Sequence, residues 1–215
     1  MSETSYLVTG GTGFLGQAIA SLLRSEGHTV TAAGSAMADL RSPEETHGLI
    51  GSIRPDVVVH CAVQGGGIGW MRKHPVESGI DNVRINVNLL EASHSNGVRS
   101  FVGVSSACAY PKVCPVPFQE EDLWNGYPEP SNGSYALSKR IMMDLGRAYA
   151  EQHGFHSVFP VLANLYGPGD HLDSERAHVV ADLMIRCASS PSELVVWGTG
   201  AASREFLYVD DAAKG

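Results

Sequence analysis

The stretch Gly-Gly-Thr-Gly-Phe-Leu-Gly at residues 10–16 follows a short apolar segment, residues 6–9, and precedes a helical pattern at about residues 15–26. It satisfies two overlapping spacings, Gly-x-x-Gly-x-x-Gly and Gly-x-Gly-x-x-Gly. Glycine permits a tight turn and a close approach of the backbone to a pyrophosphate, while the following helix supplies free N–H donors. Strand, turn and helix in this order predict a dinucleotide-binding unit, and a turn without a ligand is the alternative.

Apolar segments and helical patterns continue to alternate beyond this turn. Further strands are expected at residues 28–33, 56–60, 101–105 and 158–161, and helices at about residues 43–53, 80–95 and 134–153. Strands that are apolar throughout are typical of a parallel sheet covered on both faces. The alternation therefore predicts an α/β fold with a Rossmann-type, doubly wound parallel sheet.

The last quarter of the chain has a different pattern. A polar loop leads to a helix near residues 177–187 and to short strands around residues 194–197 and 205–209, and residues 210–215 read as the start of a helix. We therefore expect residues 1–163 to form an NAD(P)-binding Rossmann domain, in which Asn82, at the start of an expected helix, could fix the backbone near the site. Residues 164–215 would be a small part of a substrate-binding domain whose remainder is absent from this chain.

The composition excludes several classes of protein. The chain has 215 residues, of which 43% are hydrophobic and 18% charged, and its net charge is −8. This acidic balance argues against a nucleic-acid partner. No apolar run could span a bilayer and no signal peptide is recognisable, so we expect a cytoplasmic protein without a membrane partner. The cysteines and histidines show no ligand spacing, so no metal site is predicted.

Tyr135 and Lys139 stand four residues apart in an expected helix, so that both side chains lie on one face. An ammonium group in this position favours the phenolate and would bring the pKa of the tyrosine nearer to neutrality. Such a phenol suits carbonyl–alcohol interconversion, because it can give or take a proton. On its own, the spacing indicates only a solvated helix face.

The second expected strand decides which nicotinamide cofactor is favoured. It ends in Ala-Ala-Gly-Ser-Ala at residues 32–36, without the acidic residue that usually binds the ribose 2′-hydroxyl of NAD. Ser35 could donate a hydrogen bond to a 2′-phosphate. The arginine that often binds this phosphate is missing, unless Arg41 reaches back. The pattern favours NADP, with NAD as the alternative. Asp39 could accept from the adenine amino group or be an ordinary loop residue.

Together with the segment Ser-Ala-Cys-Ala-Tyr-Pro-Lys at residues 106–112, these motifs resemble the extended short-chain dehydrogenase/reductase family. This segment and residues 164–168, 177–180 and 195–206 are similar to its GDP-L-fucose synthase branch. The dehydratase and decarboxylase branches typically carry an acidic residue after the serine, where this chain has Ala-Cys. The chain departs from the branch in the loop after Pro168, which flanks the sugar.

The resemblance implies a set of site residues. Ser106, Tyr135 and Lys139 would serve the reduction, and Cys108 and His178 would be the acid/base pair of an epimerisation. Contacts to the cofactor are implied for Gly10, Thr12, Gly13, Phe14, Leu15, Gly16, Ser35, Asp39, Leu40, Ala62, Asn82, Tyr135, Lys139, Leu162, Asn164 and Leu165. Contacts to the substrate are implied for Asn164, Arg186, Trp197 and Arg204. Packing for the cysteine and tryptophan, a helix start for the histidine and a surface position for Arg186 are the alternatives.

The resemblance also implies an activity. It is the NADP-dependent 3,5-epimerisation and 4-reduction of GDP-4-keto-6-deoxy-D-mannose to GDP-L-fucose, in a homodimer formed through the helices at residues 80–95 and 134–153. One alternative is an epimerase or 4-ketoreductase for another nucleotide sugar, such as a heptose or a natural-product deoxysugar. A dinucleotide-binding sensor without catalytic activity is the other alternative.

Overall fold

The computed structural model of the chain describes residues 3–171, 177–189, 192–196 and 199–215. Its centre is a five-stranded sheet in which every neighbouring pair is parallel. The strands run in the order β2 (Thr29–Ala33), β1 (Ser5–Thr9), β3 (Val57–His60), β4 (Ser100–Gly103) and β6 (His156–Val158). The predicted Rossmann-type parallel sheet is therefore confirmed.

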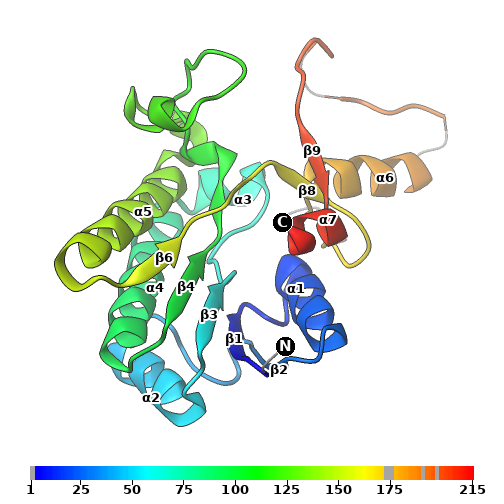
Figure 1. Cartoon of the computed structure of the whole chain (residues 1–215). Helices are drawn as coiled ribbons and strands as arrows, with labels where there is room; N and C mark the ends of the chain where they lie inside the picture. The colour runs from blue at the N-terminus through cyan, green and yellow to red at the C-terminus, as the bar shows by residue number, and fades with distance from the viewer. Residues whose placement is uncertain (1–2, 172–176, 190–191, 197–198) are drawn as a thin grey trace.

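Helices cover the sheet on both faces. On one face lie α2 (Pro43–Ile53), α4 (Pro75–Ser95) and α5 (Gly133–His153), and on the other lies α1 (Phe14–Ser25) (Figure 1). The crossover from β1 through α1 to β2 brings the start of α1 to the carboxyl edge of the sheet. This is the edge at which open α/β sheets bind their ligands.

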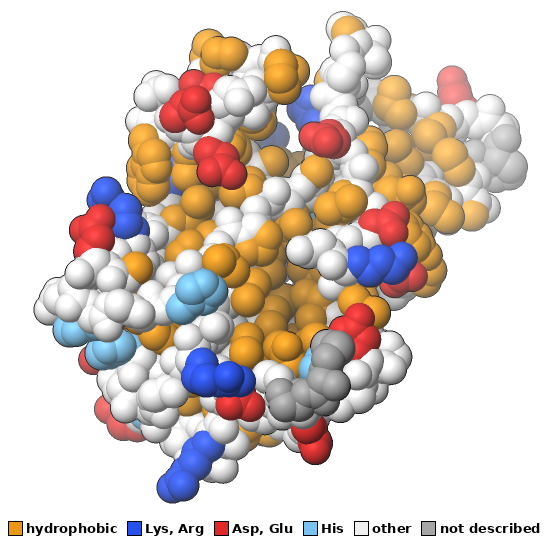
Figure 2. Space-filling model, in the orientation of Figure 1, with side chains coloured by type: hydrophobic (Ala, Val, Ile, Leu, Met, Phe, Trp, Pro, Cys, Tyr) orange, Lys and Arg blue, Asp and Glu red, His pale blue; other side chains and the backbone are white. Residues whose placement is uncertain are grey.

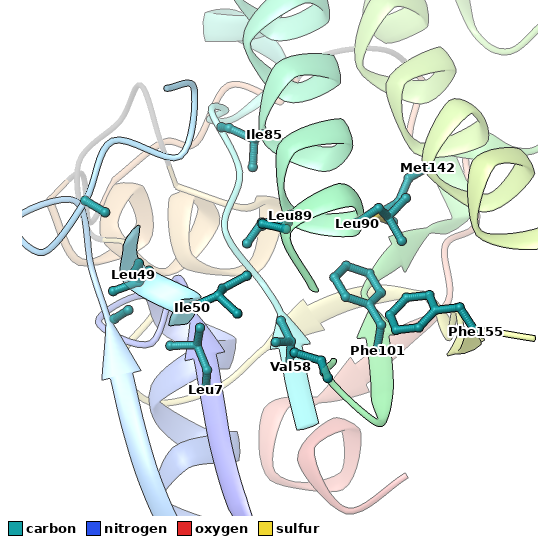
Figure 3. Packing of buried hydrophobic residues seen from close by; sticks show 14 residues of the cluster. Leu7, Leu49, Ile50, Val58, Ile85, Leu89, Leu90, Phe101, Met142 and Phe155 are labelled. Atoms are coloured by element: carbon teal, nitrogen blue, oxygen red, sulfur yellow. The ribbon is translucent and has the colours of Figure 1, made fainter. Parts of the chain in front are cut away.

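The hydrophobic core follows the alternation of side chains along the strands. Leu7 and Phe101 point to the face covered by α2, α4 and α5, where they pack with Leu89 and have no exposed surface (Figure 3). Val8, the neighbour of Leu7, points to the opposite face and packs with Ala20 of α1. Successive residues of a strand face opposite sides, so β1 is buried on both.

The edge strand β6 differs from β1. Figure 2 shows hydrophobic side chains over the middle of the view, where Figure 1 places β4 and β6, with charged side chains mainly toward the periphery. Val158 of β6 is 46% exposed. The cover on both faces that the sequence predicts therefore holds for β1, whereas the edge strand β6 leaves part of one face exposed.

Two predicted strands are divided in the structure. The segment 158–161 separates into β6 and β7 (Val161–Leu162), and Pro160, which has no N–H to donate to a ladder, lies between them. The segment 101–105 separates into β4 and β5 (Ser105–Ser106), and β5 pairs with β7. The backbone N–H of Ser105 donates to the carbonyl of Pro160 at 2.9 Å.

The last quarter of the chain forms its own small sheet. In it β8 (Asn164–Tyr166) pairs in parallel with β9 (Phe206–Tyr208). Two helices accompany the sheet, α6 (Val179–Ser189) and α7 (Val209–Lys214), and α7 packs against α1. The strand predicted at residues 194–197 is wrong for residues 194–196, which lie in no strand. The division into domains at residue 163 stays a prediction.

Several short helices were not predicted from the sequence. They are α3 (Ile68–Lys73) and the 3-10 helices η1 (Ala107–Ala109), η2 (Glu120–Trp124) and η3 (Pro130–Asn132). Helix α4 also begins earlier than expected, at Pro75, because proline is well suited to the first position of a helix. None of the helices in the described part of the chain combines the length and apolar character that a membrane crossing needs.

Candidate functional site

A cleft of about 670 Å³ opens at the carboxyl edge of the sheet. Most of the predicted site residues line it: Gly10, Thr12, Gly13, Phe14, Leu15, Gly16, Ser35, Asp39, Leu40, Ala62, Ser106, Tyr135, Lys139, Leu162, Leu165 and His178. The structure thus brings the glycine turn, the helix α5 pair and His178 to one cavity. Trp70 and His171 line the cleft as well, and no sequence motif pointed to them.

The glycine turn has a conformation that other residues would strain. Gly10 has a φ of +67°, and a Cβ built on it would lie 2.7 Å from the backbone nitrogen of Ala62. Gly13 is the N-cap of α1 and provides no side-chain cap, so the first N–H groups of the helix have no capping side chain. A close backbone and free N–H donors at a helix start fit a pyrophosphate.

We expect Gly16→Ala to destabilise the protein and Gly48→Ala to stabilise it. A Cβ on Gly16 would overlap the carbonyl oxygen of Gly10, and overpacking of this kind costs about 1–3 kcal/mol or more. Gly48 lies inside α2 with nothing within 4 Å of its built Cβ, so alanine should add about 1 kcal/mol of helix propensity. Urea unfolding measures both changes. Equal effects of the two substitutions would contradict the tight packing of the turn.

Arg41 lies at the adenosine end of the predicted dinucleotide site, but two carboxylates hold it there. Its guanidinium pairs with Asp39 at 2.8 Å and with Asp81 at 3.4 Å. Hydrogen bonds from Arg41 lower the pKa of Asp39 to about 2. Ser35 lines the same part of the cleft. Arg41, the arginine considered above for binding a 2′-phosphate, therefore lies near the site. Asp39 and Asp81 balance its charge.

The side chain of Asn82 binds the backbone of the loop that follows β3. Its side chain accepts from the backbone N–H of Gln64 at 2.8 Å and donates to the carbonyls of Gln64 at 2.7 Å and Ser78 at 2.8 Å. Asn82 is almost fully buried and is not among the described residues that line the cleft, whereas Gln64 lines it. The prediction that Asn82 fixes the backbone near the site is therefore confirmed, and its contact with the cofactor stays a prediction.

Tyr135 and Lys139 lie on one face of α5, as their spacing predicts. The ammonium of Lys139 is 5.8 Å from the centre of the Tyr135 ring and donates to the carbonyl of Val104 at 2.8 Å. Ser106, at the end of β5, lines the same part of the cleft. A phenol, a hydroxyl and an ammonium group therefore converge at one end of the cleft.

The predicted direction of the tyrosine pKa is wrong for the structure. Burial raises the pKa of Tyr135 above its ordinary value, as does the charge of Cys108, and a hydrogen bond with Ser106 opposes the rise only in part. Burial also lowers the pKa of Lys139 to about 8. Desolvation therefore outweighs the effect of the neighbouring ammonium. At neutral pH the phenol is protonated and is placed to donate its proton.

Sequence reasoning missed a buried hydrogen-bond network behind the cleft. His60 lies 2.9 Å from the hydroxyl of Thr9 and 2.9 Å from the side-chain oxygen of Asn86, and Asn86 donates to the carbonyl of Ser138 at 3.0 Å. Burial lowers the pKa of His60 to about 3, so its ring is neutral. The network connects β1 and β3 to α5 next to Lys139. Its signal in the sequence was a histidine at the end of an apolar strand.

Cys108 and His178 lie on different elements, and of the two His178 lines the cleft. Cys108 lies in η1, where its backbone N–H donates to the hydroxyl of Ser106 at 3.2 Å, and its charge acts on Tyr135. It is half-buried and is not among the described residues that line the cleft. His178 lines the cleft, and its ring centre is 6.4 Å from that of Phe14.

Three of the four predicted substrate residues lie outside the cleft lining. Asn164 donates to the carbonyl of Glu205 at 2.9 Å and so connects β8 to the approach of β9. Arg186 pairs with Asp182 at 3.3 Å, and Arg204 is exposed. Neither of these arginines nor Asn164 is among the described residues that line the cleft. Trp197 lies outside the described residues. The substrate contacts of all four stay predictions.

Comparisons with known proteins agree with this geometry. The model of the NAD dependent epimerase/dehydratase family matches residues 6–215. The chain is 37% identical to a probable GDP-L-fucose synthase 1 of Oryza sativa subsp. japonica, over 96% of the chain and 65% of that protein. It is 33% identical to the GDP-L-fucose synthase of Escherichia coli, over 99% of the chain and 68% of that protein. The chain thus spans about two thirds of these curated relatives.

Solved structures extend the likeness to three dimensions. A GDP-L-fucose synthetase from Naegleria fowleri bound to NADP has a TM-score of 0.87 and 33% identity, and covers 99% of this chain and 74% of that one. A GDP-D-glycero-L-gluco-heptose synthase from Campylobacter jejuni has a TM-score of 0.90 at 22% identity and covers 100% of this chain and 73% of that one. The second likeness shows the fold alone.

Proposed function

Because the chain belongs to the NAD dependent epimerase/dehydratase family, we propose that it acts as an NADP-dependent nucleotide-sugar 3,5-epimerase/4-reductase. The proposed reaction converts GDP-4-keto-6-deoxy-D-mannose to GDP-L-fucose. The observation that carries the proposal is the cleft in which Ser106, Tyr135, Lys139 and His178 meet the glycine turn, with Cys108 beside the phenol. Relatives named GDP-L-fucose synthase support the substrate, and the NADP-bound Naegleria fowleri structure supports the cofactor.

The cleft suits a dinucleotide along its length. The glycine turn and the start of α1 would hold the pyrophosphate, because a Cβ at Gly10 would leave no room between the turn and Ala62. Ser35, Asp39 and Leu40 would hold the adenosine end. When bound, NADPH supplies a hydride to the carbonyl carbon of the substrate. Leu162 and Leu165 would exclude water from the other end of the cleft.

The proposed epimerisation uses the acidity of carbons beside a ketone. A carbonyl at C4 makes the protons at C3 and C5 removable. Either the Cys108 thiolate or the neutral imidazole of His178 takes one, and the other group returns a proton on the opposite face. Meanwhile Ser106 and Tyr135 would donate hydrogen bonds to the enolate oxygen. One arrangement of donors thus serves both carbons.

The proposed reduction uses the same donors. As hydride reaches C4, negative charge develops on the carbonyl oxygen and Tyr135 gives it a proton. The raised pKa of the buried phenol keeps Tyr135 protonated until that charge appears. Lys139, anchored on the carbonyl of Val104, keeps a positive charge near the ring that stabilises the phenolate left behind.

We also propose that the chain forms a homodimer through α4 and α5, as the sequence resemblance implies. Ile80 on α4 is 49% exposed and Ile141 on α5 is 39% exposed, so both helices present apolar side chains to solvent. Apolar side chains of this kind are enriched in the buried centre of homodimer interfaces.

One assay tests the proposed function. The full-length protein is incubated in D₂O with NADPH and GDP-4-keto-6-deoxy-D-mannose, and NADPH oxidation is followed together with deuterium at C3 and C5. We expect both signals, because each half-reaction has its residues in the cleft. Absence of both would contradict the proposal. NADPH oxidation only with another nucleotide sugar, such as a keto-heptose, would assign the protein to the alternative substrate class.

A further inference from the structure

Asp170 makes the only hydrogen bond that the described residues give to the ring of His178. Its Oδ1 lies 2.9 Å from Nδ1 of the imidazole. The two side chains differ in environment, since that of Asp170 is 4% exposed and that of His178 is 48% exposed. A nearly buried carboxylate thus holds a ring that lines the cleft.

The local backbone explains how the carboxylate is held. Gly169 has a φ of +90°, which lets the chain turn sharply just before Asp170. Oδ1 also accepts from the backbone N–H of His171 at 2.7 Å, so two donors converge on one oxygen. The second oxygen, Oδ2, is buried and has no partner among the described residues. A buried carboxylate with one oxygen unpaired favours strong donors to the other oxygen, and the imidazole N–H is the side-chain donor among the described residues.

The chemistry of the two groups determines where the imidazole carries its hydrogen. A carboxylate accepts hydrogen bonds and donates none, and neutral imidazole has one N–H and one lone pair. The contact with Asp170 therefore requires the hydrogen on Nδ1. The lone pair is then on Nε2, the nitrogen left available to the cleft.

We propose that Asp170 is a positioning residue that fixes His178 in its Nδ1–H tautomer and so assigns proton transfer to Nε2. The inference rests on the proposed function for its role in catalysis. Nε2 takes the proton from the carbon beside the ketone, and the electron pair of the broken C–H bond becomes the enolate. The imidazolium formed keeps its Nδ1–H bond to Asp170, whose negative charge stabilises it. The thiol of Cys108 returns a proton to the opposite face and becomes a thiolate. Transfer of the imidazolium proton to this thiolate through solvent then restores both groups.

Among the described residues, Asp170 is the charged group that contacts this ring. Phe14 of α1 faces His178 with its ring and carries no charge. His171, which follows Asp170 directly, is a titratable residue of this loop that the structure describes in the cleft lining. Neither supplies an acceptor for Nδ1 in the structure. Removal of the carboxylate should therefore free the imidazole to adopt either tautomer.

The test uses the full-length protein labelled with ¹⁵N-histidine, and Asp170→Asn with Asp144→Asn as its control. Asp144 is an exposed carboxylate of α5 that pairs with Arg147 and is not among the described residues that line the cleft. His178→Asn identifies the signals of residue 178. At a pH where the ring is neutral, we expect Nδ1 to be protonated in the unmodified protein and in Asp144→Asn. In Asp170→Asn we expect a mixture of tautomers.

Two rates complete the test. Asp170→Asn should lower deuterium exchange at C3 and C5 by about 10–100-fold, the usual effect of losing a group that orients a functional histidine. It should retain the reduction of an already epimerised keto sugar, which needs no base. A purely structural role would lower both rates together, and that result would overturn the inference. Hydrogen on Nε2 in the unmodified protein would overturn it too. No exchange in the unmodified protein, with the tautomer as expected, would instead contradict the proposed function.

Discussion

Replacement of Tyr135 by Phe is expected to lower the rate of ketone reduction by about 10²–10⁴-fold, the range in which a positioned proton donor contributes. The phenol faces the cleft beside Ser106, and its raised pKa keeps it protonated at neutral pH. Phenylalanine keeps the ring and its packing but leaves the developing alkoxide without a donor. The measurement is NADPH oxidation at saturating keto sugar, together with the midpoint of thermal unfolding.

Tyr149→Phe is the matched control. Tyr149 lies on the same helix, α5, and packs against His94 and Phe155 away from the residues of the cleft. It should leave the reduction rate unchanged. Equal losses in the two variants, or full activity of Tyr135→Phe, would show that the phenol of Tyr135 is not the proton donor. The midpoint of thermal unfolding shows whether Tyr135→Phe is folded at the assay temperature, so a rate lowered by loss of folded protein would be recognised.

Features that depend on neighbouring residues could be predicted from the sequence. The glycine turn, the alternation of strands and helices and the face shared by Tyr135 and Lys139 all follow from short spacings. Helix α2 has the predicted bounds, residues 43–53, because its start is determined locally. The hydroxyl of Ser42 accepts from the backbone N–H of Glu45 at 3.2 Å, and Pro43 takes the first helical position.

Features that depend on distant contacts could not be predicted. The pairing of Arg41 with Asp81 joins residues 40 positions apart, so a sequence motif could not show that the charge of Arg41 is already balanced. The pKa of Tyr135 is set by burial under the finished fold, which outweighs the spacing to Lys139. The Asp170 contact was missed for the same reason, since the eight positions that separate it from His178 follow no motif.

Replacement of Cys108 by Ser is expected to separate the two half-reactions. A hydroxyl is a far weaker acid than a thiol, so deuterium exchange at C3 and C5 should fall by about 10²–10⁴-fold, the contribution of one acid/base group. Reduction of an already epimerised substrate should continue, because Ser106, Tyr135 and Lys139 are untouched. The backbone N–H of residue 108 still binds Ser106, which keeps that hydroxyl in place. Mass spectrometry of the product and NADPH oxidation measure the two rates.

Cys114→Ser is the control that locates the reactive thiol. Desolvation and the nearby Asp122 raise the pKa of Cys114, which disfavours its thiolate, and Cys114 is not among the described residues that line the cleft. We expect both rates to be unchanged in this variant. If Cys108→Ser lowered exchange and reduction equally, the thiol would be supporting the shape of the cleft. The assignment of epimerisation to Cys108 and His178, and of proton donation in the reduction to Tyr135, would then be wrong. This would hold even if the unmodified protein reduced the substrate.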